Sequence, residues 1–136
     1  MIGVEALEGL KVVLVDDEPG VLRALALILK AARCDVTAFS SPGEVLNHLR
    51  AGAVPDVILS DLRMPELSGV ELLRSLRAGG CRTPFILMSG HAGPSEIAEA
   101  RAEQLTTFLS KPFNPQQLLA ALSGISPILP RKAQGG

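Results

Sequence analysis

The sequence predicts an α/β domain in which a doubly wound parallel sheet of five strands is covered by five helices. Short runs rich in Val, Ile, Leu or Phe alternate with longer stretches whose apolar residues recur at helical spacing. The short runs are apolar on both faces, which is typical of parallel strands buried between two layers of helices. Five strand–helix units in succession favour an open, doubly wound sheet.

The predicted strands are short, and four of them are followed at once by a polar side chain that suits a binding site. The strands are expected at 10–15, 35–39, 56–60, 84–88 and 106–109.

The first two helices have recognisable beginnings. The helix expected at 19–32 carries a stripe of leucines and isoleucine, and Pro19 fits its first turn. The helix expected at 42–51 follows Ser41, and Glu44 stands in its first turn, which is the pattern of a capped start.

The remaining helices differ in how much apolar surface they offer. The helix at 67–78 has an apolar stripe and ends at Gly79-Gly80. The apolar residues of the helix at 94–104 are mostly alanine, so we expect it to be among the less stable elements. The helix at 114–122 begins after Asn114-Pro115 and carries a leucine stripe. We expect a domain over residues 1–123 and a flexible tail or the start of a linker over 124–136.

Composition excludes several functional classes. The 136 residues suffice for one domain, and 47% of them are hydrophobic. The net charge of −1 and the absence of Trp and Tyr argue against direct nucleic-acid contact. Cys34 and Cys81 lack metal-ligand spacing, so we expect thiols. The longest apolar run, Ala24 to Leu29, is far shorter than the about 20 residues that span a bilayer. We expect a soluble cytoplasmic protein with no membrane contact.

The polar groups that follow the strands form a chemically coherent set. Asp16 and Asp17 follow the first strand, Asp61 the third, Ser89 the fourth and Lys111 the fifth. The carboxyl ends of parallel strands meet at one edge of a sheet, and ligands of doubly wound folds bind there. Three carboxylates, a hydroxyl and an ammonium are therefore expected to converge at this edge.

This set suits a phosphoryl group held on a carboxylate with a divalent cation. Mutual repulsion among Asp16, Asp17 and Asp61 is relieved by a hard cation, and Mg²⁺ is the ion usually held by carboxylates, water and phosphate oxygens. Asp61 is then the candidate nucleophile. Lys111 and Ser89 are candidates to contact phosphoryl oxygens. Taken singly, each of these residues is more often a helix cap or a turn residue, and only their joint placement favours the functional interpretation.

With these residues at these strand ends, the chain resembles receiver domains of two-component response regulators, including the chemotaxis receivers, over about residues 10 to 123. The matching segments are Val15-Asp16-Asp17-Glu18-Pro19, Asp61-Leu62-Arg63-Met64-Pro65, Ser68-Gly69, Met88-Ser89-Gly90-His91 and Phe108-Leu109-Ser110-Lys111-Pro112-Phe113. The resemblance implies a flavodoxin-like sheet with strand order 2-1-3-4-5. It also implies a signalling domain and not an enzyme, with a histidine kinase or histidine phosphotransfer protein as phosphoryl donor.

The resemblance assigns roles to the site residues. Asp61 is the expected phosphoacceptor. Asp17, Asp61 and the backbone carbonyl of Arg63 are expected to ligate Mg²⁺ directly, with Asp16 acting largely through water. Arg63 and His91 are expected to modulate the lifetime of the phosphoryl group.

The resemblance also implies a switch. Ser89 is expected to move toward the phosphoryl group while Phe108 turns inward. The output face is then formed by 94–104, 106–109 and 114–122, through which an effector domain or a second copy of the chain would bind.

Three further expectations follow from the same resemblance. A cis peptide bond is implied between Lys111 and Pro112. The chain departs from the family at Arg33 and near Gln104, where glycine is common, so either a left-handed backbone or a different end of the preceding helix is expected there. Two other hypotheses for the function of the site residues remain open: a Mg²⁺-dependent phosphohydrolase or phosphotransferase, and an interaction module that works without phosphorylation.

Overall fold

The computed structural model describes residues 7–125, and these form five strand–helix units. The elements are β1 (Lys11–Val15), α1 (Pro19–Ala31), β2 (Asp35–Phe39), α2 (Pro42–Arg50), β3 (Val57–Asp61), α3 (Gly69–Ala78), β4 (Phe85–Ser89), α4 (Pro94–Ala102), β5 (Thr107–Ser110) and α5 (Pro115–Ile125). Each predicted strand and helix is present, with ends displaced by at most three residues.

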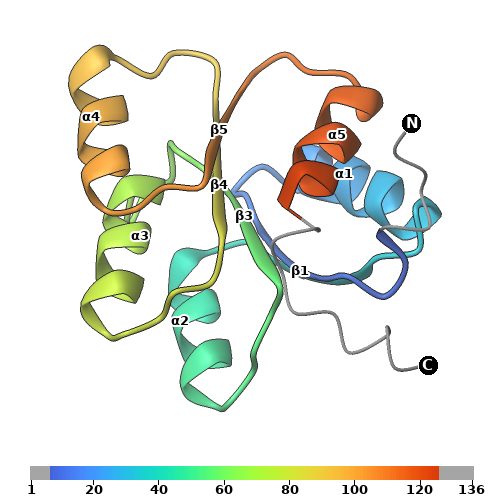
Figure 1. Cartoon of the computed structure of the whole chain (residues 1–136), viewed down its shortest axis with the longest axis horizontal. Coiled ribbons are helices and arrows are strands. Elements are labelled where there is room, and N and C mark those ends of the chain that lie inside the picture. Colours follow the sequence, from blue (N-terminus) through green and yellow to red (C-terminus); the bar gives the residue numbers. More distant parts are fainter. Residues whose placement is uncertain (1–6, 126–136) are drawn as a thin grey trace.

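The five strands form one parallel sheet in the order β2-β1-β3-β4-β5, which confirms the predicted flavodoxin-like fold. Helices α1 and α5 cover one face, and α2, α3 and α4 cover the other (Figure 1). The chain leaves β1 for β2 on one side and later returns to β3 on the other. The strand order therefore reverses next to β1, and the carboxyl ends of β1 and β3 flank this switch point.

Strict alternation along the central strands divides the core into two. Val12 and Leu14 of β1 pack with α1 and α5, whereas Val13 and Val15 pack with α2, α3 and α4. β3 and β4 are buried along their whole length, as predicted. The prediction that all five strands are buried on both faces was wrong for β2 and β5. These are the edge strands, and a neighbour on one side only leaves their residues partly exposed.

Helix α5 is longer than predicted. It continues to Ile125, which is 2% exposed and belongs to the core on the α1 side of the sheet. The expected tail over 124–136 falls mostly outside the described residues, and the division of the chain at residue 123 stays a prediction. Neither Cys34 nor Cys81 forms a disulfide. Among the helices of residues 7–125, none has both the length and the apolar character needed to cross a membrane.

Three backbone expectations are met. The Lys111–Pro112 peptide bond is cis. Arg33 and Gln104 have φ of 68° and 64°, in the left-handed region where glycine is common. Arg33 follows the C-cap of α1, and Gln104 follows the C-cap of α4. Both helices therefore end in a left-handed residue, a position where glycine is most common but which a non-glycine residue occupies here.

Candidate functional site

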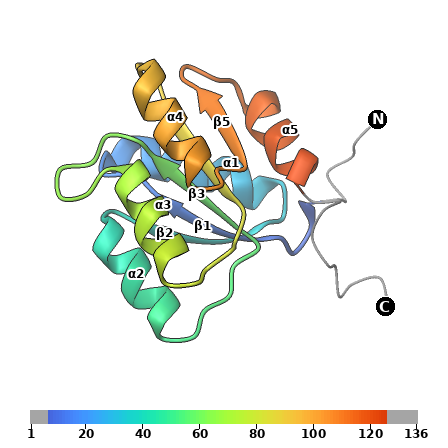
Figure 2. The ribbon, with the colours of Figure 1, turned by 60° about the vertical axis from the view of Figure 1, so that its left-hand side comes forward.

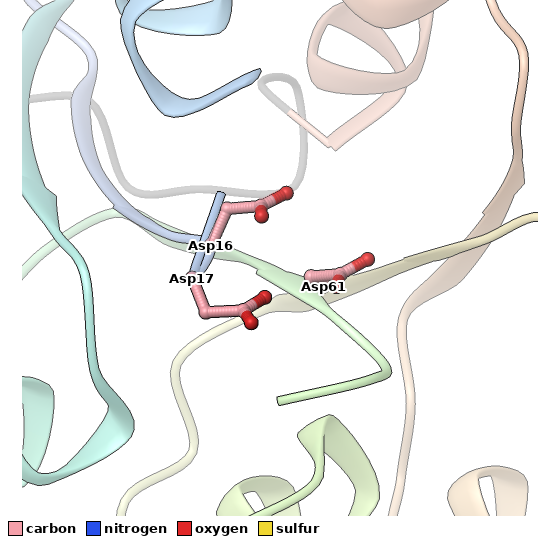
Figure 3. A group of neighbouring side chains, drawn as sticks. All are labelled: Asp16, Asp17 and Asp61. Carbon is pink, nitrogen blue, oxygen red and sulfur yellow. The ribbon is translucent and has the colours of Figure 1, made fainter. Parts of the chain in front are cut away.

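The carboxylates predicted at the switch point meet there. Asp16 and Asp17 follow β1, and Asp61 is the last residue of β3. Figure 3 shows the three side chains facing a common space from these two strand ends. One carboxylate oxygen from each residue lies within 4.8 Å of those of the other two. Asp16 is fully buried, Asp61 is 7% exposed and Asp17 is half-buried, so solvent reaches the group mainly from the Asp17 side.

Lys111 supplies a cation to this acidic group. Its Nζ donates to Asp61 Oδ1 at 2.8 Å and lies 3.5 Å from Asp16 Oδ2. Lys111 is held in place by the sheet, because its backbone N–H donates to the carbonyl of Ser89 at 2.9 Å just beyond the paired ends of β4 and β5. One ammonium thus faces three carboxylates, and the arrangement has an excess of negative charge.

Burial and charge shift the ionisation of this group. Burial raises the pKa of Asp16 above its ordinary value, and the negative charge of Asp61 raises it further. The hydrogen bond from the Glu18 N–H and the positive charge of Lys111 lower the pKa but do not cancel the effect of burial. Burial alone would lower the pKa of Lys111. The hydrogen bond to Asp61 and the charges of both carboxylates outweigh burial, so that the pKa of Lys111 is raised. Lys111 is therefore held charged, while Asp16 resists ionisation.

Local packing fixes the position of Asp61. Helix α3 begins against the backbone that follows β3, and Gly69 makes this approach possible. A Cβ atom at Gly69 would lie 2.5 Å from the carbonyl oxygen of Asp61 and 2.5 Å from Leu87 Cδ1. The N–H of Gly69 donates to the carbonyl of Leu62 at 2.8 Å. Ser68 caps the helix through a reciprocal capping box with Glu71.

The remaining predicted site residues line the same cavity. A cavity of about 340 Å³ is bounded by Asp17, Glu18, Asp61, Arg63, Ser89, Gly90, His91 and Lys111. Ser89 ends β4, is 4% exposed, and its Oγ accepts a hydrogen bond from the His91 N–H at 3.1 Å. Phe108 lies apart from the cavity on β5, half-buried and paired in register with Leu87.

Two contacts of this region were not anticipated from the sequence. The Arg63 guanidinium turns from the carboxylates and forms a bidentate ion pair with Glu96 of α4, with nitrogen–oxygen distances of 2.6 and 2.9 Å. Its Nη2 also donates to the His91 carbonyl at 3.1 Å. Arg63 and Glu96 are 33 residues apart, so no spacing in the sequence could indicate their contact.

Together, the strand order and the charged groups define a class: a flavodoxin-like α/β domain with an acidic site at its switch point. The family model of the response regulator receiver domain matches residues 12–123. The chain therefore belongs to the response regulator receiver family, as its resemblance implied.

Relatives and solved structures agree with this assignment. Response regulator protein TodT of Pseudomonas putida is 33% identical over 119 residues, covering 88% of this chain and 52% of TodT. Transcriptional regulatory protein FixJ of Azorhizobium caulinodans is 36% identical over 117 residues, covering 85% of this chain and 54% of FixJ. The chain thus spans about half the length of these relatives. The structure of the chemotaxis response regulator CheY4 of Vibrio cholerae superposes with a TM-score of 0.79 at 30% identity, covering 86% of this chain and 98% of CheY4.

Proposed function

We propose that the protein is a phosphoacceptor signalling switch in which Asp61 accepts a phosphoryl group from a histidine kinase or histidine phosphotransfer protein. The observation that carries this proposal is the placement of Lys111. Its ammonium lies 2.8 Å from Asp61 Oδ1, at a cavity that Asp17 and Asp61 also line. Phosphoryl transfer needs a nucleophile and a nearby cation that stabilises the negative charge of the phosphoryl oxygens, and Asp61 and Lys111 supply these two groups.

The acidic group fits Mg²⁺. Three carboxylates offer oxygen atoms within 4.8 Å of one another, and oxygen atoms are the donors that Mg²⁺ prefers. We propose Asp17, Asp61 and the Arg63 carbonyl as direct ligands, with Asp16 acting largely through water. When bound, Mg²⁺ would neutralise negative charge on the transferring phosphoryl group.

The protein groups perform the rest of the reaction. A carboxylate oxygen of Asp61 attacks the phosphorus atom and forms an O–P bond while the P–N bond to the donor histidine breaks, and the nitrogen keeps the bonding electron pair. Lys111 follows the negative charge from the Asp61 carboxylate to a phosphoryl oxygen. The Ser89 hydroxyl, which now accepts from the His91 N–H, donates to another phosphoryl oxygen. Arg63 and His91, which line the cavity mouth, modulate access of hydrolytic water and thus the phosphoryl lifetime.

The signal is read on the face formed by α4, β5 and α5. Figure 2 shows α4 and β5 side by side with α5 beyond them. Ser89 pairs in register with Ser110, and Phe108 with Leu87, so a shift of Ser89 is transmitted directly to β5. We propose that Phe108 turns inward as Ser89 moves. The face then binds an effector domain or a second copy of the chain, without nucleic-acid contact by this domain.

Phosphorylation by a small acyl phosphate, followed by intact-protein mass spectrometry, tests the proposal. With Mg²⁺ the wild type is expected to gain one phosphoryl group. The gain should be abolished by chelation of the metal and in Asp61→Asn. Asp35→Asn is the matched control, because Asp35 is exposed at the start of β2 and far from this edge. Sustained turnover of the phosphodonor beyond stoichiometry would instead indicate a phosphohydrolase, and no gain at all would indicate an interaction module.

A further inference from the structure

Helix α4 is attached to the domain by arginines more than by apolar packing. Of its residues, all of which the structure describes, only Ala100 is buried. Arg63 precedes α3, and Arg74 and Arg77 belong to α3; all three reach across to α4 or to the turn that follows it. Since buried apolar area contributes little here, the ionic and hydrogen-bond contacts at the two ends determine how α4 is held.

The C-terminal end of α4 is anchored independently of the site. The Arg77 side chain, in a residue that is 8% exposed, donates to the carbonyls of Glu103 and Gln104 just past α4, at 3.1 and 2.9 Å. It also donates to the carbonyls of Cys81 and Thr83 between α3 and β4, at 3.0 and 2.8 Å. Breaking this set would leave the buried Arg77 guanidinium without its acceptors, so this end is expected to stay in place.

The N-terminal end is held by one exposed ion pair. Arg63 binds both carboxylate oxygens of Glu96 in the first turn of α4. Glu96 Oε1 also accepts from the Gly93 N–H at 3.0 Å, which caps the helix. The Arg63 side chain is 60% exposed, so packing does not prevent it from turning.

Arg63 also stands where the phosphoryl chemistry would occur. It is two residues beyond Asp61 and lines the cavity with Asp61 and Lys111. A phosphoryl group brings a charge of about −1.5 to −2 and three strong acceptor oxygens. The planar guanidinium matches phosphate oxygens as well as it matches a carboxylate. Phosphorylated Asp61 would thus compete with Glu96 for the same side chain.

We propose that Arg63 is a partner-exchange latch on α4, and this rests on the proposed function of Asp61. Without phosphorylation, Arg63 holds the first turn of α4 through Glu96 and the His91 carbonyl. With a phosphoryl group on Asp61, Arg63 leaves Glu96 for a phosphoryl oxygen, and α4 opens at its N-terminal end about the Arg77 anchor. Glu96 is a positioning residue that acts through Arg63 and opposes activation.

Hydrogen exchange of the metal-free, unphosphorylated protein tests the latch itself. Glu96→Gln keeps an oxygen for the Gly93 cap but removes the ion pair. We expect the amide of Ile97, which donates to the Gly93 carbonyl at 3.1 Å, to exchange about two- to fivefold faster, with amides near Arg77 unchanged. Glu99→Gln is the control, since Glu99 pairs with Arg74 at 3.7 Å and does not touch Arg63. Equal Ile97 exchange in Glu96→Gln and wild type would overturn the latch.

Binding of beryllium trifluoride with Mg²⁺, followed by backbone amide NMR, tests the exchange of partners. Glu96→Gln should bind this phosphoryl mimic about two- to fivefold more tightly than wild type, because the competing carboxylate charge is lost. Arg63→Ala removes both the latch and the new contact, so any effect of Glu96 that acts through Arg63 should vanish in this background. Adding Glu96→Gln to Arg63→Ala should then change nothing.

The outcomes separate this inference from the proposed function. A gain in affinity that persists in the Arg63→Ala background would show that Glu96 does not act through Arg63. No gain in Glu96→Gln, while the wild type still binds the mimic and is phosphorylated on Asp61, would overturn the latch alone. A wild type that neither binds the mimic nor accepts a phosphoryl group would overturn the proposed function and the latch with it.

Discussion

Replacing Gly69 by alanine is expected to destabilise the domain, although alanine is the better helix former. The added Cβ would lie 2.5 Å from the Asp61 carbonyl oxygen and 2.5 Å from Leu87 Cδ1, and 3.1 Å from Leu62 Cα. The Leu87 methyl can move with its side chain, but the Asp61 oxygen is backbone at the end of a buried strand. Relief therefore requires α3 to shift away from β3.

The magnitude follows from two opposing effects. Overpacking costs about 1–3 kcal/mol, and a clash with backbone belongs at the upper end of that range. The gain from replacing glycine in a helix is about 0.5–1 kcal/mol. Gly69→Ala should thus lower the free energy of unfolding by about 2 kcal/mol. The matched control is Gly43→Ala in the first turn of α2, where no atom lies within 4 Å of the added Cβ. It should raise stability by up to about 1 kcal/mol.

Urea unfolding followed by far-UV circular dichroism measures both variants, since the chain has no Trp or Tyr for fluorescence. With a slope of about 2 kcal/mol/M, the Gly69→Ala midpoint should fall by about 1 M at an unchanged slope. The variant should also bind Mg²⁺ more weakly, because α3 and the Asp61 backbone move together. A Gly69→Ala protein as stable as Gly43→Ala would refute this account of how α3 positions Asp61.

Three further variants test other parts of the structure. Lys111→Met should destabilise the metal-free fold by about 1–2 kcal/mol, because Asp61 and its buried neighbour lose their cation. Without that cation the pKa of Asp16 in the folded state rises further, so the deficit should grow as pH rises from 5 to 8 in thermal unfolding, and a deficit that shrinks would contradict the assignment. Arg77→Met should cost about 2–3 kcal/mol in urea unfolding, because a buried guanidinium and the four hydrogen bonds that it donates to partly buried carbonyls are lost, and a neutral change would show that water replaces the guanidinium. Arg33→Gly should stabilise by about 1 kcal/mol in the same assay, since φ is 68° there, and any loss of stability would mean that the left-handed backbone carries little strain.

The site could be predicted because the carboxyl ends of all strands in a parallel sheet lie at the same edge, so residues at these ends are close in space. Asp16, Asp61 and Lys111 are 45 and 50 residues apart in the chain, yet each lies at the carboxyl end of a strand, and these ends share one edge of the sheet. Alternation of strands and helices was enough to place them there. Lys111 was expected to meet a phosphoryl oxygen, and in the structure it already pairs with Asp61 and Asp16.

The contacts that hold α4 could not be predicted in the same way. The sequence places Arg63 beside the phosphorylation site but gives no sign of its ion pair with Glu96, and Arg77 is one more charged residue of the helix predicted at 67–78, because the partners of both come from other segments of the chain. Within residues 7–125, the Arg77 side chain donates hydrogen bonds to backbone carbonyls only, so no partner side chain could mark it in the sequence. The partial exposure of β2 was also missed, because its apolar residues were taken to indicate burial on both faces, although its Asp35 and Thr37 are polar and the implied strand order makes it an edge strand.

The central claim is that Asp61 carries the phosphoryl group, and locating the group in the chain tests it most directly. The protein phosphorylated with Mg²⁺ and a small acyl phosphate is trapped by borohydride reduction of the acyl phosphate, digested and mapped by mass spectrometry. The modification is expected on Asp61 alone. A modification on Asp16 or Asp17, or an unmodified Asp61 in a protein that has gained mass, would contradict the account.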